Sequence, residues 1–434
     1  MMINLIYQVW PISWIEPQFK GDNRSALRKI IDFLPRISNL GAKYLWLSPI
    51  FSSPWRDHGY DVKNYRTIDS RFGSMKEFEE LVKKARDYYG IKILMDLVLN
   101  HTSIEHQWFD AHPEYYCRSS ADKPGWQNLF DNKSCWEYDK KRGDYYLHLF
   151  DKTQADLNWF PNGLTGKPNQ ELAREFQDIV DFWVNKGIAG FRLDAMQCIN
   201  KNPASDKFDP FATATEEYRQ LAAKVMNAIF NETREDLYLL MECLDLNGEM
   251  VRYYYENTPV NAVMDNTPVN TLSITEDRSV TERSLEDYIS AVRKVYETCP
   301  GGYAHVTESH DCPRFTTAAG VDGKDALDIL FGLYKGKRFI LPYTIVIYQG
   351  QELGLGNPSA ENLPNQKMVE LDAQTKMRFE RGESLDDLRL TSRANARVAI
   401  PMEEYRKQEK KNISSCLSYC EILYYRWMSD YAAP

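Results

Sequence analysis

The stretch Leu172-Ala-Arg-Glu-Phe-Gln-Asp-Ile-Val-Asp-Phe-Trp-Val-Asn-Lys-Gly-Ile-Ala-Gly-Phe-Arg-Leu-Asp-Ala195 contains the unit from which we predict the fold. Its first half carries an apolar stripe at helical spacing: Leu172, Phe176, Ile179, Val180 and Trp183. Gly187 marks the end of this predicted helix, and the residues after it form a short apolar strand entered through Gly190. A helix, a glycine and a buried strand make one unit of an α/β fold.

This unit recurs along the chain. In its clearest copy Ser74 and Glu77 have the spacing of a capping box, Gly90 ends the helix, and a strand follows at residues 91–96. Further copies pair helices with strands at residues 27–40 and 44–47, 218–230 and 237–242, 284–295 and 303–306, and 326–334 and 343–348. Non-alternating apolar strands separated by helices predict a parallel sheet covered on both faces. About eight repeats favour a closed (β/α)8 barrel (TIM barrel) over an open sheet.

Two features refine this prediction. No glycine-rich phosphate loop follows a predicted strand, which argues against a nucleotide-binding doubly wound fold. Residues 102–167 interrupt the pattern, because they are rich in Trp, Tyr, Asp and Lys and lack a helical stripe. We therefore predict that residues 1–101 and 168–434 form the barrel, and that residues 102–167 form an irregular subdomain inserted after the third strand, over the barrel mouth.

Composition narrows the class of protein. A chain of 434 residues with 43% apolar residues suits one large globular domain with an insertion, or two domains. Its net charge of −9 is spread without a basic stripe, which excludes nucleic acid as an expected partner. Neither a signal peptide nor an apolar run of membrane-spanning length is found in the sequence, so we expect a soluble, cytoplasmic protein with no membrane partner. The eight scattered cysteines are expected to be reduced thiols.

The strand ending at Asp194 supplies a first candidate for chemistry. Arg192 and Asp194 are two residues apart on a strand, so their side chains project to the same face. We expect the guanidinium to hold Asp194 ionised, as a nucleophile requires. A purely structural Arg–Asp pair explains this segment equally well.

Other predicted strand ends add polar residues, and active sites of barrels form at this end of the strands. They are Asp57-His58-Gly59-Tyr60-Asp61, Asp96 with Asn100-His101, Glu242, and His310-Asp311. Taken singly, each is explained by a buried ion pair or a satisfied core histidine. Together they indicate one polar, carboxylate-rich pocket.

The chemistry that fits this pocket is cleavage of glycosidic bonds, because the chain has no hydride, phosphate or metal-hydrolase signature. Asp194 is the predicted nucleophile. Glu242 lies between Met241 and Cys243, apolar surroundings that favour a protonated carboxyl, and is the predicted proton donor. Asp311 is predicted to bind sugar hydroxyls and to favour the distorted, charged transition state. We expect no cofactor and no metal.

Four segments carry a family resemblance. Asp96-Leu-Val-Leu-Asn-His101, Gly190-Phe-Arg-Leu-Asp194, Glu242 and His310-Asp311 resemble the four signature regions of the α-amylase family of glycoside hydrolases, family 13. Further segments resemble its oligo-1,6-glucosidase and α-glucosidase branch, whose members include dextran glucosidase, sucrose isomerase and trehalose-6-phosphate hydrolase: Ser53-Pro-Trp-Arg-Asp-His-Gly-Tyr60, Tyr145-Tyr-Leu-His-Leu-Phe150, Ala155-Asp-Leu-Asn-Trp159 and Tyr348-Gln-Gly-Gln-Glu-Leu353.

The resemblance implies a retaining, exo-acting α-glucosidase that acts on short oligosaccharides or disaccharides. It implies the roles given above for Asp194, Glu242 and Asp311. It also implies that the terminal glucose is bound by Asp57, Tyr60, His101, Arg192 and His310, and that Arg397 closes the pocket against Asp57. In this branch a Val after the nucleophile accompanies α-1,6 cleavage. Here the residue is Ala195, which favours α-1,4-linked or sucrose-like substrates.

The sequence departs from the family in three places. Only Asp22 and Asn23 could supply side-chain oxygens in the region that binds calcium in relatives, so we predict no tightly bound calcium. Glu308-Ser309 precedes His310, where relatives usually place an Asn. After Arg397 follow a charged stretch at 403–411 and a helical pattern at 415–427, so the usual C-terminal β-sandwich is expected to be missing. Barrel surface uncovered in this way would favour a homodimer.

Two alternatives stay open at this stage. One is a transferase, isomerase or phosphorylase of the same family, in which a sugar hydroxyl or phosphate replaces water. The other is a non-catalytic, amylase-like binding scaffold. Such scaffolds typically lose the catalytic carboxylates and carry a membrane anchor, whereas all three carboxylates are present in this sequence.

Overall fold

The computed structural model describes most of the chain, namely residues 3–15, 22–129, 133–163, 166–199, 201, 216–230, 236–243, 248–265, 272, 282–357, 378, 382, 384, 393, 396–397, 400, 402–410 and 415–432.

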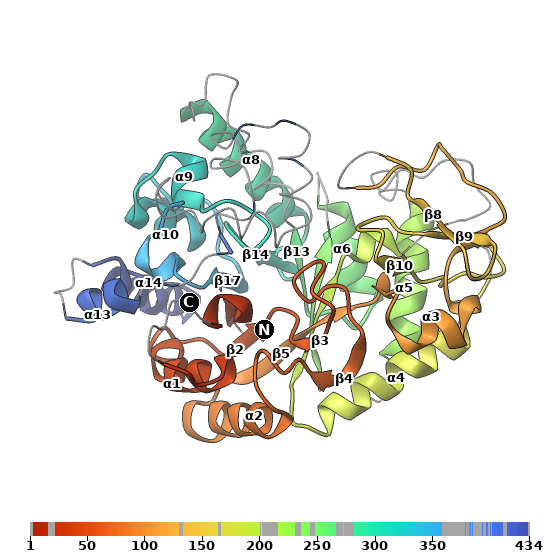
Figure 1. The fold of residues 1–434 in the computed structure, drawn as a ribbon. Helices are drawn as coiled ribbons and strands as arrows, with labels where there is room; N and C mark the ends of the chain where they lie inside the picture. The colour runs from red at the N-terminus through yellow and green to blue at the C-terminus, as the bar shows by residue number, and fades with distance from the viewer. Residues whose placement is uncertain are drawn as a thin grey trace.

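Eight parallel strands close into a barrel in chain order, which confirms the predicted fold (Figure 1). They are β1 (Asn4–Val9), β2 (Tyr44–Leu47), β5 (Lys92–Val98), β11 (Gly190–Asp194), β12 (Tyr238–Cys243), β13 (Ala262–Asp265), β14 (Tyr303–His305) and β17 (Thr344–Tyr348). The first and last strands complete the ring, with Asn4 paired to Thr344.

Helices cover the outside of the barrel. The larger ones are α1 (Ala26–Asn39), α2 (Met75–Tyr89), α4 (Gln170–Val184), α5 (Glu216–Ile229), α6 (Glu249–Asn257), α8 (Glu282–Thr298), α10 (Gly323–Leu330) and α14 (Cys416–Ala432). Shorter helices are η1 (Pro11–Trp14), α3 (Gln107–Ala111), η2 (Pro113–Tyr115), η3 (Met196–Cys198), α9 (Phe315–Ala319), η6 (Gln351–Leu353) and α13 (Met402–Glu409). Helix α2 begins at the predicted capping box of Ser74 and Glu77 and ends at Gly90, whose φ is 64°.

Two local predictions were wrong. Strand β13 was not predicted, because the repeated unit was recognised by its helix, and the helix before β13, α6, was not predicted either. The helix predicted at 326–334 ends at Leu330, and β15 (Leu333–Tyr334) pairs with β16 (Lys337–Arg338). Gly332 explains the break: its φ is 81°, and a Cβ there would lie 2.2 Å from the carbonyl oxygen of Ile340.

The barrel interior is apolar below and polar at its mouth. Ile6, Trp46, Leu94 and Leu240 belong to a buried cluster inside the ring. Two positions later, on or directly after each of these strands, the next inward residue is polar: Gln8, Ser48, Asp96 and Glu242. The pleat therefore places a polar layer on a packed apolar floor, at the carboxyl ends of the strands.

The segment between β5 and β11 forms small antiparallel sheets. Strand β6 (His101–Ser103) pairs with β10 (Gln154–Asp156), and β9 (Asp144–Leu147) lies between β7 (Arg118–Ser119) and β8 (Trp136–Asp139). A cluster containing Trp126, Trp136 and Leu149 also includes Ala195, so this segment packs against the residue that follows β11. In Figure 1 it lies on the side of the barrel opposite α8, α10 and α14. The subdomain boundaries at 102 and 167 stay a prediction.

Three further observations concern the chain as a whole. Within the described ranges, no helix is long and apolar enough to cross a membrane. All eight cysteines are free thiols. The predicted C-terminal helix corresponds to α14, and dimerisation stays a prediction.

Candidate active site

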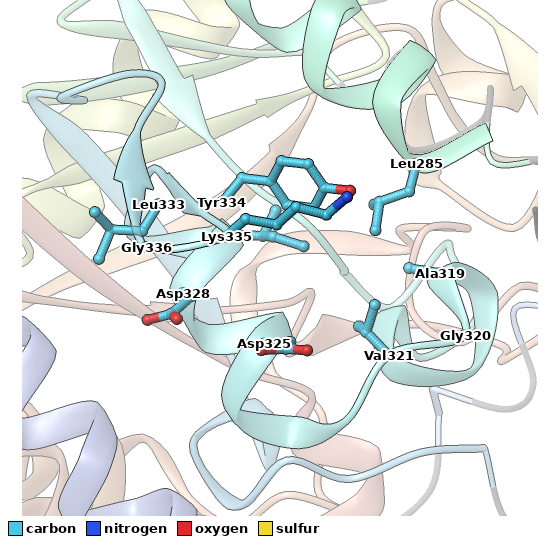
Figure 2. Close-up of a pocket in the computed structure, with 11 residues that line it drawn as sticks. Leu285, Ala319, Gly320, Val321, Asp325, Asp328, Leu333, Tyr334, Lys335 and Gly336 are labelled. Carbon is cyan, nitrogen blue, oxygen red and sulfur yellow. The ribbon is translucent and has the colours of Figure 1, made fainter. Parts of the chain in front are cut away.

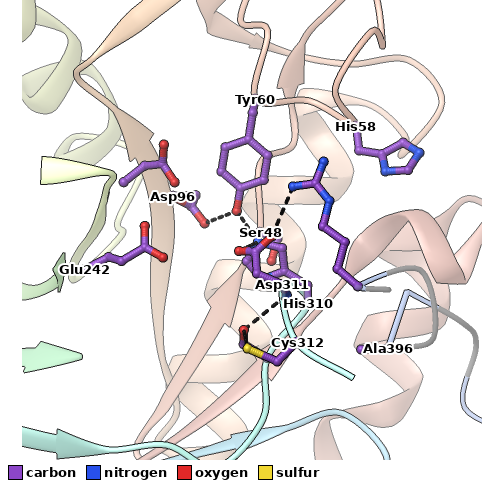
Figure 3. A network of polar contacts seen from close by, with 12 residues as sticks. Ser48, His58, Tyr60, Asp96, Glu242, His310, Asp311, Cys312 and Ala396 are labelled. Atoms are coloured by element: carbon purple, nitrogen blue, oxygen red, sulfur yellow. Dashed lines mark hydrogen bonds and ion pairs between the residues drawn. The ribbon is translucent and has the colours of Figure 1, made fainter. Parts of the chain in front are cut away.

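The predicted site residues meet at the barrel mouth. Asp96 lies on β5, Arg192 and Asp194 on β11 and Glu242 on β12, while His310 and Asp311 follow β14. Asp57 and Tyr60 follow β3 (Phe51–Ser52), which pairs with β4 (Asn64–Ile68). Figure 3 shows Asp96 and Glu242 to one side of Tyr60, with His310 and Asp311 beside its hydroxyl group.

Arg192 is the centre of the carboxylate cluster. Its side chain is fully buried, and Nη1 lies 2.9 Å from Asp96 Oδ1 and also forms an ion pair with Asp194 Oδ1. Its Nη2 lies 2.6 Å from Glu242 Oε2, which also accepts a hydrogen bond from the backbone N–H of Ala195 at 3.0 Å. Because one guanidinium contacts both Asp194 and Glu242, the two carboxylates lie side by side and face the same space.

The charge state expected for Asp194 needs correction. Burial raises the pKa of Asp194 well above its usual value, Arg192 opposes this, and the charges of Glu242, Asp96 and Asp311 add to it. Burial also raises the pKa of Asp96 to about 6, again against the effect of Arg192. Arg192 is shared among the three carboxylates, and burial outweighs its effect on the pKa of both Asp194 and Asp96, so Arg192 alone does not fix the charge of Asp194.

The opposite wall contains Asp311 and His310. Burial by itself raises the pKa of Asp311. The neighbouring His310, Arg397 and Arg393 outweigh burial and hold this pKa well below its usual range. His310 Nε2 lies 2.9 Å from Asp311 Oδ2 and 2.6 Å from the Tyr60 hydroxyl. Burial lowers the pKa of His310 to about 4, so this imidazole is neutral at pH 7. The Tyr60 hydroxyl also donates to Asp96 Oδ2 at 3.2 Å, which links the two walls.

Arg397 was expected to pair with Asp57, but in the structure Arg393 forms this ion pair. Arg393 Nη2 donates to Asp57 Oδ1 at 3.0 Å, and its Nη1 lies 3.4 Å from Asp311 Oδ1. Arg397 instead donates to Asp311 Oδ1 at 2.9 Å and to the carbonyl of His310, and its Nη1 lies 2.8 Å from His58 Nδ1. The arginines are four residues apart in one segment, and the sequence does not show which one turns toward Asp57.

His101 joins the site through a residue that sequence reasoning missed. Gln154, on β10, is fully buried, and its Nε2 lies 3.0 Å from His101 Nε2 and donates to Asp57 Oδ2 at 3.2 Å. Gln154 directly precedes Ala155-Asp-Leu-Asn-Trp159, one of the segments that resemble the oligo-1,6-glucosidase branch. Its place beside this segment was the only feature of the sequence that pointed to Gln154. Arg393 and Gln8 were missed as well.

Across the part of the chain that the structure describes, no three His, Cys, Asp or Glu side chains form a metal-binding group. Asp22, one of the two residues considered as calcium ligands, forms an ion pair with Arg24 at 2.7 Å. The expectation of no tightly bound calcium stays a prediction.

A separate hollow of 340 Å³ lies away from this mouth, between α8, α10 and the β15–β16 hairpin (Figure 2). Its carboxylates are Asp325 and Asp328, and the latter accepts a hydrogen bond from Tyr419. The ammonium group of Lys335 lies 5.2 Å from the centre of the Tyr334 ring, so the aromatic face has a cation beside it. None of the predicted site residues lines this hollow.

Comparison with known proteins agrees with the geometry of the mouth. Residues 8–410 match the model of the alpha-amylase catalytic domain. The chain belongs to the alpha-amylase family. It is an enzyme of the glycoside hydrolase type, and the resemblance to the oligo-1,6-glucosidase branch is confirmed.

Several relatives of this alpha-amylase family enzyme have assigned names. It is 30% identical to a glucan 1,6-alpha-glucosidase of Streptococcus pneumoniae over 92% of this chain and 75% of the relative. It is also 30% identical to a probable oligo-1,6-glucosidase 3 of Bacillus subtilis, over 88% of this chain and 71% of the relative. The crystal structure of Bacillus licheniformis trehalose-6-phosphate hydrolase superposes with a TM-score of 0.80 at 25% identity, covering 99% of this chain and 83% of that one.

Proposed function

We propose that the protein is a retaining, exo-acting α-glucosidase that releases the terminal glucose of short oligosaccharides or disaccharides. The contact that carries this proposal is the shared guanidinium of Arg192, which places Asp194 and Glu242 side by side. Neighbouring carboxylates suit a retaining mechanism, whose carboxyl groups are about 5 to 5.5 Å apart, whereas inverting enzymes separate them by roughly 6.5 to 9.5 Å.

The reaction proceeds in two displacements. Asp194 attacks the anomeric carbon and forms a glycosyl ester, while Glu242 gives its proton to the leaving oxygen. Glu242 then takes a proton from water, and the resulting hydroxide attacks the same carbon and releases Asp194. The first step requires Glu242 in its protonated form and Asp194 in its charged form, with Asp194 beside the guanidinium of Arg192.

The remaining residues bind one glucose unit. Asp57, Tyr60, His101, Arg192 and His310 line the terminal-sugar subsite in this proposal, and Asp311 stabilises positive charge at the ring. Arg393 and Arg397 place two guanidinium groups on the Asp57 and Asp311 side of the mouth. We infer that they close the subsite beyond the terminal sugar, so that only a chain end enters.

An Arg393→Ala variant tests this closure. We expect kcat/KM for a disaccharide to fall roughly 10- to 150-fold, the worth of hydrogen bonds from a charged group to carboxylates. The loss should shrink as the substrate lengthens. Kinetics on maltose-type substrates of increasing length measure both effects, and Arg406→Ala, at an exposed position of α13, is the matched control. An equal loss at every length would contradict a chain-end pocket.

The preference for α-1,4 or sucrose-like bonds over α-1,6 bonds stays a prediction, and the names of the relatives do not support it. It depends on Ala195, which has a left-handed φ of 44° and donates its N–H to Glu242. Incubation with maltose, isomaltose, sucrose and trehalose 6-phosphate, with and without inorganic phosphate, tests substrate and acceptor together. We expect free glucose and faster hydrolysis of maltose than of isomaltose. Sugar phosphates or new disaccharides would identify a phosphorylase, transferase or isomerase, and no turnover of any of these four sugars would contradict the proposed substrates.

A further inference from the structure

The first barrel strand brings an uncharged residue to the site. Gln8 is the polar inward residue at the end of β1 and is fully buried. Its Nε2 donates to Ser48 Oγ at 3.2 Å and lies 2.7 Å from His310 Nδ1. Neither of these contacts is with Asp194 or Glu242, so an effect of Gln8 on the reaction would pass through the histidine.

The His310 ring is fixed in place from several sides. Trp10 stacks on it with ring centres 4.8 Å apart and an angle of 15°, and the edge of the ring faces Trp46. Nδ1 meets Gln8, and Nε2 meets both Tyr60 and Asp311. Whether each nitrogen donates or accepts depends on which of the two carries the proton.

The groups around Nε2 determine which nitrogen of His310 is protonated. Asp311 is ionised, and its Oδ2 lies 2.9 Å from His310 Nε2, so Oδ2 requires a hydrogen-bond donor at Nε2. An unprotonated Nε2 would instead set its own lone pair against a lone pair of Oδ2. A doubly protonated ring would add a buried cation to the charges of Arg397 and Arg192, and burial disfavours it more than the nearby Asp311 favours it. The neutral ring therefore carries its proton on Nε2, and Nδ1 must accept.

We propose that Gln8 is a positioning residue, which donates to His310 Nδ1 and so holds the imidazole as the Nε2–H tautomer that binds Asp311. The hydrogen bonds then run in one direction. The Gln8 amide donates to His310, His310 Nε2–H donates to Asp311 and the Tyr60 oxygen, and the Tyr60 hydroxyl donates to Asp96. In the opposite tautomer the Tyr60 hydroxyl would turn toward Nε2, so Asp96 and Asp311 would each lose a donor.

The expected effect of Gln8 on kcat rests on the proposed function, whereas the tautomer of His310 does not. Asp311 and Asp96 belong to the two walls of the proposed sugar subsite, and misdirected hydrogen bonds would weaken transition-state binding more than substrate binding. The tautomer itself is a property of the free protein, so it can be measured whether or not the protein hydrolyses a glucoside.

The experiment uses the whole protein labelled with ¹⁵N only in its seven histidines. Side-chain nitrogen resonances report the tautomer, and the His310 signals are identified by their loss in a His310→Asn sample. In the wild type we expect Nδ1 at the position of an unprotonated nitrogen and Nε2 at that of a protonated one. A protonated Nδ1 in the wild type would overturn the proposal without any variant.

Two variants and a control complete the test. Gln8→Met keeps the length of the side chain and removes the donor, and Gln8→Glu substitutes an acceptor. We expect a mixed tautomer in the first and a protonated Nδ1 in the second. We expect kcat to fall roughly 10- to 100-fold and KM to change less, by analogy with the loss of a hydrogen-bond partner from a metal-bound histidine. Ser48→Ala removes the other partner of Gln8 and should keep both the wild-type tautomer and kcat. An unchanged tautomer in Gln8→Met, or equal damage in Ser48→Ala, would leave Gln8 with a packing role only.

Discussion

An Asp194→Asn variant is expected to lose turnover of an aryl α-glucoside by on the order of 10⁴-fold or more while remaining folded. The amide cannot form the glycosyl ester, and removal of a catalytic nucleophile costs this much in other hydrolases. Release of the aryl alcohol measures the loss, and circular dichroism verifies the fold. Turnover close to that of the parent would remove the proposed mechanism.

A smaller side chain makes the same prediction more specific. Asp194→Gly leaves room for azide beside the anomeric carbon, in the place of the missing carboxylate. Azide should then restore cleavage of an activated α-glucoside in a single displacement and give the β-glucosyl azide. An α-glucosyl azide would mean that another group is the nucleophile.

The Asp194→Asn substitution should also make the melting temperature less sensitive to rising pH. Burial raises the pKa of Asp194 in the folded state, so the folded protein binds this proton more tightly than the unfolded chain does. The stability associated with that proton is present at low pH and is lost as pH rises from about 4, the unfolded value, toward the folded pKa. Asp194→Asn cannot ionise, so between pH 5 and 8 its melting temperature should fall less than that of the parent.

A Glu242→Gln variant is expected to show a loss that depends on the leaving group. A disaccharide needs a proton on its leaving oxygen, so its hydrolysis should fall roughly 10²- to 10⁴-fold. Glucosyl fluoride needs little protonation, so its first step should be nearly preserved and a burst of fluoride should precede slow turnover. Stopped-flow detection of fluoride separates these steps, and Glu79→Gln, an exposed residue of α2, is the matched control.

Azide provides the second half of that test. Once Glu242 cannot activate water, azide needs no base and should accelerate turnover, giving the α-glucosyl azide by attack on the covalent intermediate. A loss of equal size for disaccharide and fluoride, with no azide product, would assign the proton donor to a different residue.

The sequence predicted the parts of this molecule that depend on local pattern. The helix spacing, the capping box at Ser74 and the glycine at Gly90 predicted the repeated unit, and closure of eight parallel strands followed from it. The carboxylates at Asp194 and Glu242 were found because each ends an apolar strand. Strand β13 was missed together with α6, the helix before it, so no helix–strand unit was recognised there.

What the sequence did not predict depends on contacts between distant segments. Arg393 and Arg397 look alike in sequence, and only the folded chain shows which one binds Asp57. Gln8 is uncharged and lies 302 positions from its histidine partner, so no motif connects them. The raised pKa of Asp194 results first from burial and then from the charges of Glu242, Asp96 and Asp311 on other segments, whereas the sequence showed only its neighbour Arg192.

Closure of the ring between β1 and β17 has a consequence for biosynthesis. Asn4 and its partner Thr344 are separated by 344 − 4 = 340 positions. At roughly 5 to 20 residues per second, a ribosome takes on the order of 17 to 68 seconds to make the second partner after the first. During that interval one edge of β1 has no strand beside it, and such an edge can pair with other nascent chains. The yield of native protein should therefore depend on how well the cell shields the N-terminal strand until the last one emerges.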